Sequence, residues 1–121
     1  MLNNWIEQLR GSRVGAAALA KASPGLMAGF KALSAGQNAN GALDAKTKEL
    51  IALAVAVTTR CDSCIAAHAS AARAAGVTEA ELADALGTAI ALNAGAAYSY
   101  SIRVLEAFDQ FAAPRGELSR G

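Results

Sequence analysis

Four side chains capable of thiol and acid–base chemistry lie close together in the sequence: Glu49, Cys61, Cys64 and His68. The chain has only two cysteines and one histidine, and all three fall within one segment, 61–68. Residues four apart lie on one face of a helix, so the His68 ring is expected to reach the Cys64 sulfur. Two thiols three positions apart can close a disulfide, and a nearby base can make one of them a thiolate. The spacing indicates a dithiol redox centre.

The spacing also bears on which cysteine reacts first. Both cysteines are expected near a helix start, where the amide dipoles stabilise a thiolate. His68 lies one turn beyond Cys64 and can take its proton, which favours Cys64 as the reactive thiolate. Cys61 would then capture a sulfenic acid on Cys64 as a disulfide. The opposite order, in which the first cysteine is the nucleophile as in thioredoxins, stays open, as does a merely structural pair of buried thiols.

Two acidic residues lie near the thiols, and the first of them allows two interpretations. Glu49 is either a solvated charge in the first turn of a helix, where Glu is favourable, or an inward-facing residue, since the apolar run 50–57 follows it. Asp62 is a candidate cap for the helix that carries the cysteines.

The pattern of Glu, eleven residues, Cys-x-x-Cys, three residues and His resembles the signature of the alkylhydroperoxidase D-like branch of the carboxymuconolactone decarboxylase family. The resemblance runs from about Leu43 to Phe108 and includes the segment 72–82. It implies an alkylhydroperoxidase D-like fold, the order Cys64 then Cys61, and a proton relay in which Glu49 assists His68, directly or through a water. The chain departs from one well-known branch at Ser63, where that branch has a second histidine, so the relay here has fewer groups that can transfer a proton.

The resemblance implies a thiol-dependent hydroperoxide reductase that serves antioxidant defence. Its partners would be a peroxide substrate and an external dithiol reductant of lipoyl or thioredoxin-like type, with no bound cofactor. A different class is a dithiol–disulfide oxidoreductase or redox sensor without appreciable peroxidase turnover. A third is a zinc-binding module in which the same four side chains are the ligands. Lactone decarboxylation is the least expected activity, because that branch of the family does not depend on this set of residues.

The composition favours a small helical protein that assembles with itself. The 121 residues predict a single domain, 1–121. Hydrophobic residues make up 54% of the chain but aromatic ones only 5%, and alanine supplies much of the apolar content. Small side chains bury little area each, so a homo-oligomer is expected. The family resemblance implies dimers, trimers or hexamers, and a trimer or hexamer is expected here. The net charge of +1, with mixed signs along the chain, argues against a nucleic-acid partner.

The sequence predicts neither export nor membrane insertion. The opening residues 1–7 contain charge and amide groups where a secretory leader would be apolar. The segment 85–102 carries no formal charge, but its polar residues and glycines favour a helix or helix pair buried in protein over a membrane span. Two cysteines beside a histidine then suggest a reducing compartment, so a cytoplasmic protein is expected.

No segment alternates between apolar and polar residues as a strand would, so the fold is predicted to be an all-α bundle of about five to seven helices. Ser23 with Pro24, Asp44, and the capping box that starts at Thr78 mark helix starts, and Gly76 marks a helix end. The expected helices are 2–10, 24–35, 44–57, 62–76 and 78–93, with a last helix after a break or kink at Gly95 that runs to Phe108 or Phe111. The segment 11–23 is ambiguous, 36–41 is expected to be a loop, the chain is expected to turn at 60–61, and 114–116 is expected to end the ordered part.

Five further residues have less certain roles. Tyr98 and Tyr100 are expected in the core or at a subunit interface, or else beside the thiols. Asn93 indicates a buried polar contact between helices or subunits. Lys46 and Lys48 are expected to form a solvated face.

Overall fold

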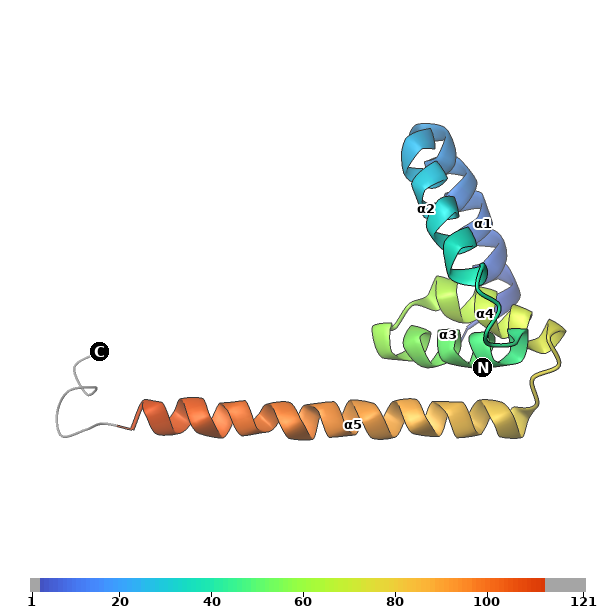
Figure 1. Cartoon of the computed structure of the whole chain (residues 1–121). Helices are drawn as coiled ribbons and strands as arrows, with labels where there is room; N and C mark the ends of the chain where they lie inside the picture. The colour runs from blue at the N-terminus through green and yellow to red at the C-terminus, as the bar shows by residue number, and fades with distance from the viewer. Residues whose placement is uncertain (1–2, 113–121) are drawn as a thin grey trace.

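The computed structural model describes residues 3–112, and over that range the chain forms five α-helices and no strand (Figure 1). The helices are α1 (Trp5–Ala22), α2 (Pro24–Asn38), α3 (Ala45–Thr59), α4 (Asp62–Ala74) and α5 (Glu79–Gln110). The all-α prediction is therefore confirmed, with a number of helices inside the predicted range. The predicted end of the ordered part at 114–116 lies outside the described residues.

The predicted helix starts are largely correct, because each has a local chemical cause. Pro24 is the first residue of α2, where its missing N–H costs nothing. The Asp44 side chain accepts a hydrogen bond from the Thr47 amide at the start of α3. Gly76, with φ of 82°, follows the end of α4, where a residue with a Cβ would be strained.

The segment that the sequence left ambiguous is helical, and the predicted break at Gly95 is wrong. Residues 11–22 continue the first helix, with Gly11 and Gly15 inside it, and Gly95 lies inside a single α5 of 32 residues. A glycine in a helix costs about 1 kcal/mol relative to alanine but removes no hydrogen bond, so it does not by itself end a helix. The loop after α2 also starts later than expected, because that helix extends to Asn38.

The centre of the molecule is the pair α3 and α4, which pack against each other along their lengths. The α1 helix packs on α4, α5 packs on α3, and α2 packs on α1. A small apolar core forms where α3, α4 and the start of α5 meet, around Leu53, Ala72 and Val77, with Leu50 and Leu82 at its edge. This core holds α3 and α4 in a fixed register, which decides which of their side chains face each other.

Two parts of the fold extend away from this core. The α1–α2 hairpin stands out on one side, and α5 continues past the end of α3 with no helix beside it (Figure 1). The segment 85–102 was expected to be buried in protein, but within this chain most of it is exposed. None of the described helices combines the length and hydropathy needed to cross a bilayer.

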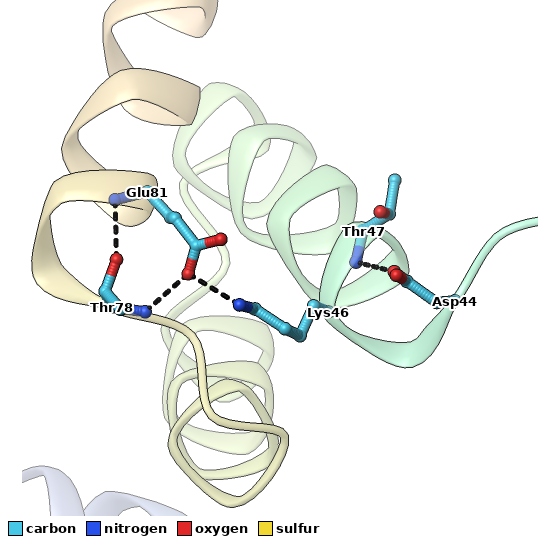
Figure 2. Close-up of polar contacts among 5 residues, drawn as sticks. All are labelled: Asp44, Lys46, Thr47, Thr78 and Glu81. Carbon is cyan, nitrogen blue, oxygen red and sulfur yellow. Dashed lines mark hydrogen bonds and ion pairs between the residues drawn. The ribbon is translucent and has the colours of Figure 1, made fainter.

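Polar contacts join α5 to α3 at their starts (Figure 2). The Lys46 ammonium lies 2.9 Å from Oε1 of Glu81, and the same oxygen accepts a 2.9 Å hydrogen bond from the Thr78 amide. The Glu81 amide in turn donates to the Thr78 hydroxyl, which completes the predicted capping box. Lys46 is therefore paired rather than merely solvated, and Lys48 donates to the Gln37 carbonyl.

These contacts lower the pKa of two carboxyl groups. The Thr78 amide and then Lys46 hold the pKa of Glu81 below its ordinary value of 4.5. Hydrogen bonds from Thr47 hold the pKa of Asp44 below its ordinary value of 3.8. A carboxyl group whose pKa is lower in the folded state stabilises the fold above its unfolded pKa, and this contribution is lost as the pH falls through the folded pKa.

We therefore expect the thermal unfolding midpoint to fall as the pH drops below about 4.5, where Glu81 begins to titrate in the unfolded chain. Glu81→Gln keeps an oxygen acceptor for the capping box but cannot titrate, so it should flatten part of that fall. Circular dichroism melts between pH 3 and 7 measure the effect. Asp84→Asn, a charge loss one turn further along α5, serves as the control. Identical pH profiles for wild type and Glu81→Gln would contradict the prediction.

Candidate active site

A short turn between α3 and α4 places the two cysteines. Arg60 ends α3 in the left-handed conformation, with φ of 55°. This reverses the chain, so that Cys61 becomes the N-cap of α4 and Cys64 lies in its first turn. The helix start at Asp62 is as predicted, but the cap is Cys61: its sulfur accepts a 3.2 Å hydrogen bond from the Cys64 amide. Asp62 is the first residue of the helix and does not cap it.

Cys61 and Cys64 form a disulfide in this structure, with their Cα atoms 5.2 Å apart. The predicted proximity of the two sulfurs is confirmed. Both cysteines are half-buried, so part of each side chain is open to solvent. The pair therefore lies at the start of a helix, as predicted.

The Glu49 side chain faces the dithiol helix and contacts His68. Its Oε2 atom lies 2.7 Å from Nδ1 of the histidine, with 21% of the Glu49 side chain and 41% of the His68 side chain exposed. The interpretation of Glu49 as a merely solvated charge is wrong, and the predicted approach of Glu49 to His68 is confirmed as a direct contact. A carboxylate only accepts hydrogen bonds, so the proton of a neutral His68 lies on Nδ1 and Nε2 has a free lone pair.

The His68 ring follows Cys64 by one turn of α4, on the same side of the helix. With the disulfide closed, the hydrogen bond of the ring goes to Glu49. Contact between Nε2 and the Cys64 sulfur stays a prediction for the reduced form. The cysteine pair thus lies at the start of α4, and His68 lies one turn further along the same helix. Glu49 reaches His68 from α3.

One contact at the site was not expected from the sequence. The Ser12 hydroxyl donates a 2.9 Å hydrogen bond to the hydroxyl of Ser63, the second of the two residues between Cys61 and Cys64 in the motif. The two serines are separated by 51 positions, and a serine in a helix carries no signal for a distant partner. This contact ties α1 to the first turn of the dithiol helix.

The more distant candidates lie away from the thiols. Tyr98 and Tyr100 are exposed on the part of α5 that extends past α3, so within this chain neither belongs to the core or lines the site. Asn93 does join two helices, because its amide donates a 2.9 Å hydrogen bond to the Thr58 hydroxyl and also bonds to the Ala89 carbonyl. The contact is at the surface rather than buried.

The described residues do not show the arrangement of ligands that the zinc-binding alternative requires. Across residues 3–112, no group of three or more His, Cys, Asp or Glu side chains is placed to hold a metal ion. Both candidate sulfur ligands are joined to each other in the disulfide.

The arrangement can perform reversible thiol chemistry with proton transfer. Opening the disulfide yields two thiols at a helix start, where backbone amides favour a thiolate. His68 can accept a proton from the adjacent thiol, and Glu49 fixes the tautomer of the ring and stabilises it once it is charged. The N-cap hydrogen bond favours negative charge on Cys61, whereas His68 favours it on Cys64, so the order of reaction is decided by which effect is larger.

Comparison with known proteins agrees with the fold and the motif. Residues 24–107 match the carboxymuconolactone decarboxylase family. An uncharacterised protein of Haemophilus influenzae is 55% identical over 108 residues, which is 89% of this chain and 96% of that protein. An uncharacterised protein from the cox locus of Paracoccus denitrificans is 43% identical over 67% of this chain and 73% of its own length. The apo crystal structure of a carboxymuconolactone decarboxylase family protein from Legionella pneumophila has a TM-score of 0.69 and 36% identity, covering 90% of this chain and 97% of that one. The match covers most of the chain and includes both cysteines, Glu49 and His68, so this protein belongs to the carboxymuconolactone decarboxylase family.

Proposed function

We propose that this protein is a thiol-dependent hydroperoxide reductase. The observation that carries the proposal is the placement of the Cys61–Cys64 pair at the start of α4, one turn before a His68 ring that Glu49 holds by its Nδ1 atom. A disulfide between neighbouring helical positions can be opened and closed with little movement of the backbone. The ring beside it supplies the proton acceptor that such a cycle needs.

In the reduced enzyme, His68 takes the proton of Cys64, and the thiolate attacks the terminal oxygen of the hydroperoxide. The O–O bond breaks, the alcohol leaves with a proton from His68, and Cys64 becomes a sulfenic acid. The thiol of Cys61 then attacks the Cys64 sulfur, which releases water and closes the disulfide. An external dithiol of lipoyl or thioredoxin-like type reduces the disulfide and is itself oxidised by two electrons.

A dithiol–disulfide oxidoreductase or sensor is the second candidate. The N-cap hydrogen bond to the Cys61 sulfur supports it, because stabilisation of the Cys61 thiolate favours exchange with other disulfides through the first cysteine, as in thioredoxins. Such a protein would change redox state reversibly but would not consume peroxide in the steady state.

The test is steady-state consumption of hydrogen peroxide and an organic hydroperoxide, with a dihydrolipoyl donor and a thioredoxin system supplied separately. Wild type should turn over with at least one donor, and Cys64→Ser should reduce consumption to that of a protein-free blank. Ser70→Ala, an exposed change on the same helix, should keep wild-type activity. Reversible oxidation of wild type without turnover on any peroxide and donor would reject the peroxidase and favour the oxidoreductase.

A further inference from the structure

The contact between Ser12 and Ser63 reaches the dithiol motif from a distant part of the chain. Ser63 is the second residue of α4 and lies between the two cysteines. Ser12 is a half-buried residue near the middle of α1, the helix that packs on α4. Within residues 3–112, the 2.9 Å bond between their hydroxyls is the only side-chain hydrogen bond that joins these two helices. It gives α1 a specific polar contact with the segment that the two cysteines enclose.

The first turn of α4 is held only in part by the helix itself. The Ile65 amide donates a 2.9 Å hydrogen bond to the Cys61 carbonyl, and the Cys64 amide donates a 3.2 Å hydrogen bond to the Cys61 sulfur. The first amides of a helix have no acceptor within it, so the helix does not fix Asp62 and Ser63 by their own N–H groups. Both residues are exposed, and packing therefore restrains them little. The bond from Ser12 is the contact that holds the middle of this segment against another helix.

The hydrogen bond from Ser12 and the disulfide restrain the same four residues, 61–64. A closed disulfide between Cys61 and Cys64 forms a ring through residues 62 and 63 and restricts their conformation. With the ring closed, the bond from Ser12 forms without further ordering of this turn. With the ring open, the same bond has to order the turn, which costs conformational entropy. The bond is therefore more stable in the disulfide form, and by thermodynamic reciprocity it shifts the equilibrium toward the disulfide.

We propose that Ser12 is a positioning residue that acts through Ser63 on the closure of the Cys61–Cys64 disulfide. It holds the first turn of α4 so that the two sulfurs stay close together while neither is bonded to the other, which raises the effective concentration of one at the other. This inference rests on the proposed function, in which the step concerned is the attack of the Cys61 thiol on the sulfenic acid of Cys64. The S–S bond forms, the S–O bond breaks, and the oxygen leaves as water with the proton of the Cys61 thiol.

The first test is the reduction potential of the Cys61–Cys64 pair, measured in redox buffers of glutathione and of dithiothreitol with the thiols counted by alkylation and mass spectrometry. Ser12→Ala should lower the equilibrium constant for disulfide formation about threefold to fivefold, within the range for one neutral hydrogen bond. Since a factor of ten corresponds to about 30 mV, the potential should rise by about 15–20 mV. Ser12→Thr keeps the hydroxyl and should restore the wild-type potential. Ser70→Ala, an exposed change on α4 away from the contact, should also leave it unchanged.

A double-mutant cycle separates this role from a general effect on stability. Ser63→Ala removes the partner of Ser12, so adding Ser12→Ala to it should produce no further rise in the potential. Thermal unfolding of each variant in both redox forms checks that the chain stays folded. Equal potentials for wild type and Ser12→Ala would overturn the proposal. A rise caused by Ser12→Ala that persists in full in the Ser63→Ala background would also overturn it, because the effect would then not pass through Ser63.

These measurements contain no peroxide, so failure of the inference and failure of the proposed function are distinguishable. A wild type that consumes no peroxide rejects the peroxidase, and a raised potential in Ser12→Ala supports the role of Ser12 all the same. A wild type that turns over while Ser12→Ala keeps its potential overturns the inference alone. A wild type that forms no disulfide in any of the buffers also overturns the inference. If both proposals hold, Ser12→Ala should accumulate more Cys64 sulfinic acid than wild type under excess peroxide, because slower closure leaves the sulfenic acid open to further oxidation.

Discussion

Cys61→Ser should reduce one equivalent of peroxide and then stop, with turnover at the level of a protein-free blank. Cys64 and His68, which carry out the first step in the proposed cycle, are both retained. The sulfenic acid on Cys64 then has no resolving thiol, because the chain has only two cysteines. Excess peroxide should drive Cys64 on to sulfinic acid, which simple thiols do not reverse. Mass spectrometry of the protein after one and ten equivalents of peroxide measures both stages.

Cys61→Ser and Cys64→Ser together decide which of the two cysteines reacts first. In the reduced wild type, Cys64 should alkylate faster than Cys61 with a small electrophile, and at a lower pH midpoint. Cys64→Ser, in which Cys61 keeps its position at the helix cap, is the matched control and should react slowly. Preferential labelling of Cys61, with single-equivalent peroxide reduction retained in Cys64→Ser, would reverse the assignment. The amide of residue 64 that bonds to the Cys61 sulfur would then be the dominant influence.

Replacing His68 with alanine should slow both alkylation of Cys64 and peroxide reduction by roughly 10²-fold at neutral pH, the lower end of the range for a general acid–base group. Glu49→Gln should have a smaller effect of the same kind. The amide that replaces the carboxylate 2.7 Å from Nδ1 can orient the ring but cannot balance its positive charge. In the proposed cycle, Glu49 is a positioning residue that acts through His68. Stopped-flow rates from pH 5 to 10 measure the effect of each variant.

The pH profile separates this role from a structural one. If Glu49 acts through the ring, Glu49→Gln should shift the midpoint of the alkylation profile, while reaction at high pH, where the thiol ionises without help, should approach the wild-type rate. Glu79→Gln, an exposed charge loss at the start of α5, should leave the profile unchanged. An equal reduction at every pH in Glu49→Gln, together with a lower unfolding midpoint, would show that the residue supports the fold and not proton transfer.

The parts of the site that the sequence predicts well are those set by local spacing. The interval between Cys61 and Cys64 places their sulfurs together at a helix start. The interval from Cys64 to His68 places the histidine one turn further along the same face. The contact of Glu49 with His68 depends on the packing of α3 against α4, and the resemblance to a known family predicted it where the helical pattern left two interpretations. The capping roles of Asp44 and Thr78 were predicted from their own side-chain chemistry.

The features that could not be predicted depend on contacts between distant segments. Nothing near Ser12 indicates that it meets Ser63, because that contact is set by how α1 lies on α4. The continuity of α5 through Gly95 was missed because a single glycine weakens a helix without ending it. The exposure of Tyr98 and Tyr100 was also missed, since an apolar pattern shows that a side chain needs cover but not whether its own chain supplies it.

The short turn at Arg60 has a consequence for how the protein folds. Glu49 and His68 are 19 positions apart, and the helices that carry them are joined by only two residues, so the contacts that build the site are local. Local contacts require little loop closure and form in microseconds to milliseconds, whereas association of chains is slower and depends on concentration. A newly made chain is therefore expected to bring its two cysteines and its histidine–carboxylate pair together early in folding, without waiting for a second chain. In the proposed function, the thiol chemistry would then be available to a single chain at any level of expression.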